Sequence, residues 1–155
     1  MGHTALEIVG LFFAGLLAGE EFVIRYGVQP ALTQLEDRAH LQARQALIRR
    51  LRILVPSLML PTVVLGISVL IRGTFAPGAA FRWAGAAALL VFVLSSFLGT
   101  VPINIKVVQW QVEAPPADWK AVIRRWEQID VLRSSAAMLA FVLFLIAASL
   151  RIAER

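Results

Sequence analysis

The chain has 155 residues, of which 59% are hydrophobic and 16% are charged, and its net charge is +5. This composition excludes an ordinary soluble domain, because a chain of this length cannot bury so much apolar surface in one core. The absence of cysteine excludes disulfides, thiolate nucleophiles and cysteine-ligated metal sites. The sequence therefore predicts an integral membrane protein.

Four segments have the length and apolar composition of a membrane-spanning helix, which needs about 20 residues. They cover approximately residues 6–24, 53–71, 83–101 and 131–150. We interpret the first as a retained span rather than a signal peptide, because no Lys or Arg precedes it and no A-x-A cleavage site follows. The predicted fold is all-α, with one domain that forms a four-transmembrane-helix bundle.

Basic residues gather in the two hairpins that follow the first and third predicted spans. These hairpins contain Arg25, Arg38, Arg44, Arg49, Arg50, Arg52, Lys106, Lys120, Arg124, Arg125 and Arg133. The opposite side has only Arg72, Arg82, Arg151 and Arg155. By the positive-inside rule, the hairpins face the cytoplasm and both termini face outside, in a bacterial inner (plasma) membrane. The lipid bilayer is the expected partner, and nucleic acid is not, because the basic residues flank spans.

Two adjacent carboxylates occur in the last third of the first span, where charge is expensive and usually faces protein or water. Glu21 has Arg25 one turn later, so an intrahelical ion pair is its simplest explanation. Glu20 has no partner three or four residues away in its own helix. A functional acid and a structural partner of another helix both stay open for Glu20.

From Pro30, apolar residues follow helical spacing as far as the second span, which predicts one long helix that protrudes from the membrane on the cytoplasmic side. Pro56 and Pro61 should bend this helix inside the membrane.

Glu36, His40 and Arg44 lie four residues apart along the start of this helix. The spacing favours a solvated face with i,i+4 pairs. One imidazole and one carboxylate are too few ligands for a metal site, and we expect no metal.

The third span is almost featureless until Pro102 and Asn104 interrupt its apolar pattern. Asn104 could cap the helix, bond to another helix or contact a ligand. Asp118 then provides a helix N-cap before Trp119, and the last helix is expected to run to about Ala153. At 1.5 Å per residue it would be roughly 50 Å long and would also protrude on the cytoplasmic side.

Trp119, Trp126 and Arg133 are seven residues apart, and Asp130 follows Trp126 by four, so the four side chains form one stripe on the last helix. One interpretation is an aromatic belt at the membrane surface with an Asp130–Arg133 pair. A functional site is favoured by the combination of two indoles, a carboxylate and a guanidinium at a depth where polarity is costly.

Three sequence patterns occur in order along almost the whole chain: GLLAGEEFVIRYGVQPAL, then TVPINIKVVQW, then PPADWKAVIRRWEQIDVLR. With them the chain resembles a family of small four-helix integral membrane proteins, classed as a domain of unknown function, whose best-described members are anthrone oxygenases. The resemblance implies a four-helix bundle and oxygen-dependent conversion of an anthrone to an anthraquinone without an evident metal or flavin, so no cofactor is expected.

The chain departs from this family pattern at Asp130, where members of that kind usually carry a His. If that His is the base that removes an acidic C–H proton, Asp130 would be a weaker base. Glu20 and Glu21 stand where relatives more often have apolar residues, and they would supply further carboxylates.

These observations support two hypotheses about function. The first is a membrane-embedded, cofactor-independent oxygenase or oxidoreductase that acts on a lipophilic aromatic, anthrone-like or quinone-like molecule. Its catalytic residues would be Asp130, Glu20 and Arg133, and its substrate-binding residues Asn104, Trp119, Trp126 and Glu21. The second is a non-catalytic protein that binds or transports a small amphiphile or protons, for which a homo-oligomer would supply further spans.

Overall fold

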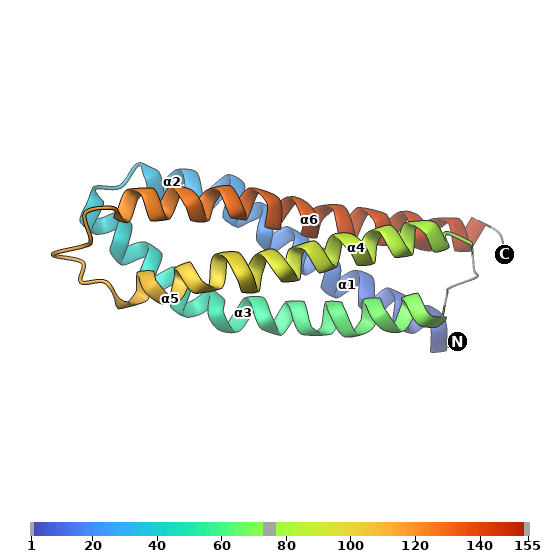
Figure 1. Ribbon diagram of the computed structural model, residues 1–155. Helices are drawn as coiled ribbons and strands as arrows, with labels where there is room; N and C mark the ends of the chain where they lie inside the picture. Colours follow the sequence, from blue (N-terminus) through green and yellow to red (C-terminus); the bar gives the residue numbers. More distant parts are fainter. Residues whose placement is uncertain (1, 73–76, 154–155) are drawn as a thin grey trace.

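The computed structural model describes residues 2–72 and 77–153. These residues contain helices and turns but no strand, which confirms the all-α prediction. The helices are joined into four rods that lie side by side along one long axis (Figure 1). Both chain termini lie at one end of the bundle, and the connections at residues 34–36 and 110–118 lie at the other.

Two of the rods are single helices, and the other two are composite. The first rod consists of α1 (Gly2–Val23), the π-helical segment η1 (Ile24–Val28) and α2 (Gln29–Thr33). The second is α3 (Asp37–Arg72). The third consists of α4 (Ala79–Ser95), the π-helical segment η2 (Ser96–Thr100) and α5 (Val101–Gln109), and the fourth is α6 (Trp119–Ala153).

Three of the rods in the described residues are long and apolar enough to cross a membrane: α3, the α4–η2–α5 rod and α6. The chain is therefore suited to a membrane environment. The first rod is not among the three. A span over residues 6–24 stays a prediction, although Ile8 and Phe12 present an exposed apolar face there. The sides on which the termini lie also stay a prediction.

One predicted helix boundary is wrong, and it concerns a proline. Pro30 does not begin the second long helix; it lies in α2, at the end of the first rod, and the long helix begins at Asp37. The third rod also contains a proline, Pro102, and continues beyond it to Gln109. Figure 1 shows that α3 changes direction along its length, and Pro56 and Pro61 both lie inside it.

A π-helical segment precedes Pro30 and another precedes Pro102. The N–H groups of Gln29 and Val101 donate to carbonyls five residues earlier, so each helix is locally widened. A proline ring clashes with the carbonyl of the residue four positions before it. For both prolines that residue lies in the π segment, and the wider turn explains why the rods continue through Pro30 and Pro102.

The closest packing in the bundle is between α6 and α4, and α3 packs less closely against α4 and α5. Small side chains on α6, Ala136, Ala137 and Ala140, allow the approach of α4, whose Phe92 is fully buried. The looser contact between α3 and the third rod leaves room for a cavity.

Candidate functional site

A cavity of about 490 Å³ lies between α3 and the third rod, and its volume is within the range of small-molecule sites. Its walls come from residues 44–59 of α3 and residues 96–109 of η2 and α5. The first rod contributes Ile24 and Gln29, and α6 contributes Trp126 and Arg133. All four rods therefore contribute to one site, and both π segments line it.

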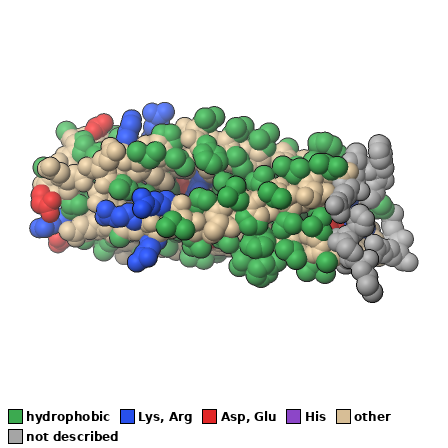
Figure 2. Space-filling view, turned by 90° about the horizontal axis from the view of Figure 1, so that it is seen from below, with side chains coloured by type: hydrophobic (Ala, Val, Ile, Leu, Met, Phe, Trp, Pro, Cys, Tyr) green, Lys and Arg blue, Asp and Glu red, His purple; other side chains and the backbone are tan. Residues whose placement is uncertain are grey.

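The cavity is open on the flank of the bundle. Phe97 and Ile105, which line it, are more than half exposed, and Arg52 at its edge is also exposed. Figure 2 shows one side of the bundle, where a recessed Lys or Arg side chain is visible between surface side chains. Lys and Arg side chains gather toward the end with the connections, and hydrophobic side chains toward the end with the termini. The exposed part of the cavity lining thus includes both apolar residues, Phe97 and Ile105, and the charged Arg52.

Arg133 is the best-anchored polar group at the cavity. Its Nε and Nη2 atoms donate to Asp130 Oδ1 at 3.1 and 3.0 Å, and Nη2 also lies 2.8 Å from Glu21 Oε2 of α1. The Asp130–Arg133 pair predicted from the sequence is therefore present. Asp130, Glu21 and Arg133 are all buried, so two carboxylates from different rods hold one guanidinium in a fixed orientation.

The predicted Glu21–Arg25 ion pair is wrong, because each residue has a partner on α6. Glu21 pairs with Arg133, and Arg25 Nη1 donates to Ser135 Oγ at 2.7 Å and to Ser134 Oγ at 3.2 Å. The carboxylate oxygens of Glu20 are buried, and they interact electrostatically with Arg133. Glu20 therefore belongs to the same interhelical cluster.

Arg44 is a second buried guanidinium at the cavity, and sequence reasoning missed it. Its Nη2 donates to Gln29 Oε1 at 2.7 Å and lies 3.4 Å from Glu127 Oε1. Its guanidinium carbon is 5.0 Å from the centre of the Trp126 ring, a cation–π geometry. A sequence signal for this was available. Leu41 and Leu47 lie three residues before and after Arg44, on the same face of the helix, and such apolar neighbours indicate a face that points into the protein.

His40 supports Arg44 from one turn earlier, so the predicted solvated face is wrong for these two residues. The Nε of Arg44 donates to His40 Nε2 at 3.2 Å, which requires a His40 nitrogen without a proton. Burial lowers the pKa of His40, and the charge of Arg44 lowers it further. Only Glu36 of the three residues is exposed.

The other predicted site residues fall into three groups: those that line the cavity, those that contact a lining residue, and one that lies further away. Asn104 and Trp126 line it together with Arg133. Asp130 and Glu21 do not line it but contact Arg133. Trp119 lies further toward the connections, where its ring packs edge-to-face with His40 at 5.7 Å.

Among the side chains that the structure describes, those of residues 5–71 and 77–153, no three His, Asp or Glu are grouped as they would be around a metal ion.

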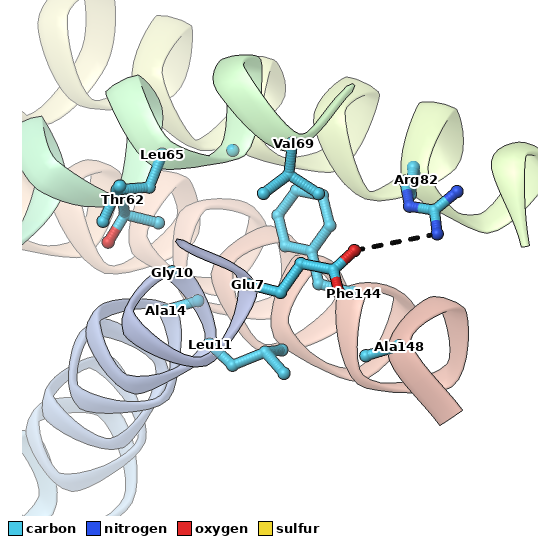
Figure 3. Close-up of a pocket in the computed structure, with 11 residues that line it drawn as sticks. Glu7, Gly10, Leu11, Ala14, Thr62, Leu65, Val69, Arg82, Phe144 and Ala148 are labelled. Atoms are coloured by element: carbon cyan, nitrogen blue, oxygen red, sulfur yellow. Dashed lines mark ion pairs between the residues drawn. The ribbon is translucent and has the colours of Figure 1, made fainter. Parts of the chain in front are cut away.

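A second cavity lies near the end with the termini and measures about 30 Å³, room for about one water molecule (Figure 3). Glu7 of α1 faces Arg82 of α4 across its edge, with Oε1 and Nη2 3.9 Å apart. Arg151 of α6 also contacts Glu7. The size of this cavity excludes an aromatic ligand, and the charged residues connect three helices at this end.

Comparisons with known proteins place the chain in a family. The sequence pattern of the family described as anthrone oxygenase matches residues 45–143, which is more than half of the 155 residues. The matched region includes most of α3, the third rod and the part of α6 that carries Trp126, Asp130 and Arg133. Neither the curated proteins nor the solved structures provide a significant match.

Proposed function

We propose that this chain, which belongs to the anthrone oxygenase family, is a membrane-embedded oxidoreductase that oxidises a lipophilic aromatic ketone in the cavity beside Arg133. The cavity carries this proposal: it has the volume of a small-molecule site, its walls are mostly apolar, and it contains buried guanidinium groups. Its opening on the flank suits a substrate that arrives dissolved in the bilayer.

The proposed reaction converts the CH₂ group of an anthrone-like ring to a carbonyl. Loss of a C–H proton gives an enolate, which O₂ then oxidises; one oxygen atom enters the product and the other leaves as water. No metal or flavin takes part in this proposal.

Arg133 is proposed to stabilise the negative charge that develops on the enolate oxygen. Its Nε and Nη2 atoms face Asp130 and Glu21, which leaves Nη1 as the donor for substrate. A preorganised donor of this kind typically accelerates a reaction by about 10²–10³-fold. Asn104 adds an amide to the cavity wall, and the Trp126 ring supplies an aromatic surface.

Asp130 is the proposed proton acceptor, and Glu20, which interacts with it electrostatically, is proposed to assist it. Neither residue lines the cavity, so we include a bridging water between the substrate and Asp130. We assign Glu21 and Trp119 a positioning role, because Glu21 contacts Arg133 and Trp119 contacts His40.

The test is oxidation of anthrone by the purified protein in lipid nanodiscs under ¹⁸O₂, with mass spectrometry of the product. We expect anthraquinone with one ¹⁸O atom, formed faster than in empty nanodiscs. Asp130→Asn and Arg133→Ala should remove the activity per molecule of folded protein, although Arg133→Ala also lowers stability because it leaves two buried carboxylates unpaired. Arg124→Ala, at an exposed position of the same helix, should keep it.

A rate equal to that of empty nanodiscs would contradict the oxygenase proposal. Unchanged aromatic ligand that accumulates inside proteoliposomes would support the alternative, a binding or transport protein. Equal loss of folded protein and of activity in Arg133→Ala would remove the assigned role of Arg133.

A further inference from the structure

We infer that the cavity selects aromatic ligands that carry an ionised oxygen, such as a phenolate or a carboxylate, and that Arg44 and Arg133 together bind this oxygen. The inference rests on the proposed function for the location of the site, but it concerns which ligands the site accepts.

The charge of the cavity wall is the first observation. Among the described residues, the wall contains Arg44, Arg52 and Arg133 but no Asp or Glu. Arg44 and Arg133 are buried, while Arg52 is exposed at the edge. A ligand anion would therefore meet attractive charge, both at the entrance and inside, and no carboxylate on the wall would repel it.

The free donors of the two buried guanidinium groups are the second observation. Arg44 uses Nε for His40 and Nη2 for Gln29 and Glu127. Arg133 uses Nε and Nη2 for Asp130 and Glu21. In the part of the chain that the structure describes, no side chain or carbonyl accepts a hydrogen bond from Nη1 of Arg44 or Arg133.

The two guanidinium groups differ in how well protein carboxylates neutralise them. Arg133 has two buried carboxylates within 3.0 Å. Among the described residues, Arg44 is paired with the partly exposed Glu127 at 3.4 Å, and the charge of Asp130 also acts on it, whereas Gln29 is uncharged. A buried guanidinium is costly unless nearby anions compensate its charge well. An ionised oxygen on the ligand would provide a further counter-ion for Arg44.

Trp126 supports the same inference, because it orients Arg44 and lines the cavity. Its ring packs against the Arg44 guanidinium, and its Nε1–H is buried without an acceptor in the described residues. The wall beside Arg44 therefore contains hydrogen-bond donors in excess of acceptors, as expected of a site for an anion.

The test compares two flat aromatic ligands of nearly equal shape, 2-naphthoate and its neutral amide, 2-naphthamide. Binding is measured calorimetrically at pH 7.5 with the protein in phosphatidylcholine nanodiscs, and heats from empty nanodiscs are subtracted. We expect 2-naphthoate to bind about 10- to 100-fold more tightly than the amide. Equal affinities, or tighter binding of the amide, would overturn the inference without any variant.

A pair of charge-matched variants then assigns the preference to Arg44. Arg44→Gln and Arg50→Gln remove the same charge, but Arg50 is exposed and does not line the cavity. We expect Arg44→Gln to remove most of the preference for 2-naphthoate and Arg50→Gln to retain it. Equal behaviour of the two variants would overturn the role of Arg44. If Arg44→Gln does not fold, Arg44→Lys is used instead. It should lower the preference for 2-naphthoate, because the Lys ammonium group lacks the planar set of N–H donors of a guanidinium.

The binding test and the oxidation test fail independently. Oxidation of anthrone without a preference for 2-naphthoate would refute this inference and leave the proposed function standing. A preference for 2-naphthoate without oxidation would support an anion-selective binding site and count against the oxygenase.

Discussion

Arg133 of α6 and Glu21 of α1 form a buried ion pair, with Nη2 and Oε2 2.8 Å apart. The pair joins the last rod to the first, and Asp130 holds the same guanidinium from within α6. Arg133 also lines the cavity, so the contact that connects the two rods orients a side chain of the proposed active site.

Glu21→Gln should destabilise the protein, because it leaves Arg133 with one counter-ion in place of two. We expect the free energy of unfolding to fall by about 2 kcal/mol or more, measured by unfolding in mixed detergent micelles. Glu113→Gln is the matched control, since it breaks an ion pair with Arg38 whose side chains are 67% and 68% exposed. The control should change stability by about 0–1 kcal/mol. Similar losses of unfolding free energy in both variants would show that the buried ion pair contributes no more stability than the exposed one.

Lowering the pH should weaken the hydrogen bond that Arg44 Nε donates to His40 Nε2. The pKa of His40 in the folded protein is lower than the ordinary value of 6.5, so the unfolded chain binds its proton more readily. The contribution of His40 to stability is therefore fully present above about pH 6.5 and is lost as the pH falls through and below that value. The protonated ring would face the positive charges of Arg44 and Lys120, with Asp37 as an opposing charge.

His40→Gln isolates this effect, because it keeps an acceptor for Arg44 but does not titrate. The thermal stability of the wild type should fall more steeply than that of the variant between pH 7.5 and pH 5.5. Parallel stability curves, or a wild type that gains stability relative to the variant at low pH, would contradict the assignment.

Gly99 allows η2 to approach α6, and a methyl group should not fit there. A Cβ atom at this position would lie 2.6 Å from Ile129 Cγ2, so we expect Gly99→Ala to cost about 1–3 kcal/mol. Gly19→Ala is the control, because nothing lies within 4 Å of a Cβ there and Ala favours a helix by up to about 1 kcal/mol. Unfolding midpoints in detergent should therefore shift in opposite directions, and equal shifts would contradict the close packing of η2.

The predicted topology can be tested because the chain has no cysteine. Ala114→Cys introduces a thiol in the second polar hairpin, and Ala80→Cys introduces one near the start of α4; both positions are exposed. A maleimide that does not cross membranes should label Ala80→Cys in intact cells and Ala114→Cys only after lysis. The reverse pattern would invert the orientation derived from the positive-inside rule.

Several features of the fold and site could be predicted from the sequence because they depend on spacing within one helix. The last helix begins at Trp119 and ends at Ala153, as expected. Trp126, Asp130 and Arg133 lie on its buried face, and the Asp130–Arg133 pair forms within it. Helical periodicity places such residues together regardless of what surrounds them.

The partners of Glu21 and Arg44 could not be predicted in this way. Local spacing predicted a pair between Glu21 and Arg25. In the structure Glu21 pairs with Arg133 of α6, and Arg25 donates hydrogen bonds to two serines of α6. Arg44 looked like a surface residue, but it turns toward Gln29 and Trp126 on other helices. The π segments at Pro30 and Pro102 were also missed, because a proline alone does not show whether a helix ends or widens.

The sequence by itself determined the apolar composition suited to a membrane, the helical content and which residues share one face of a helix, since composition and periodicity are properties of the chain. Only the tertiary structure decided which buried charges pair and where the cavity lies. Those features depend on how closely each pair of rods packs, and α3 packs loosely against α5 while α4 packs tightly against α6.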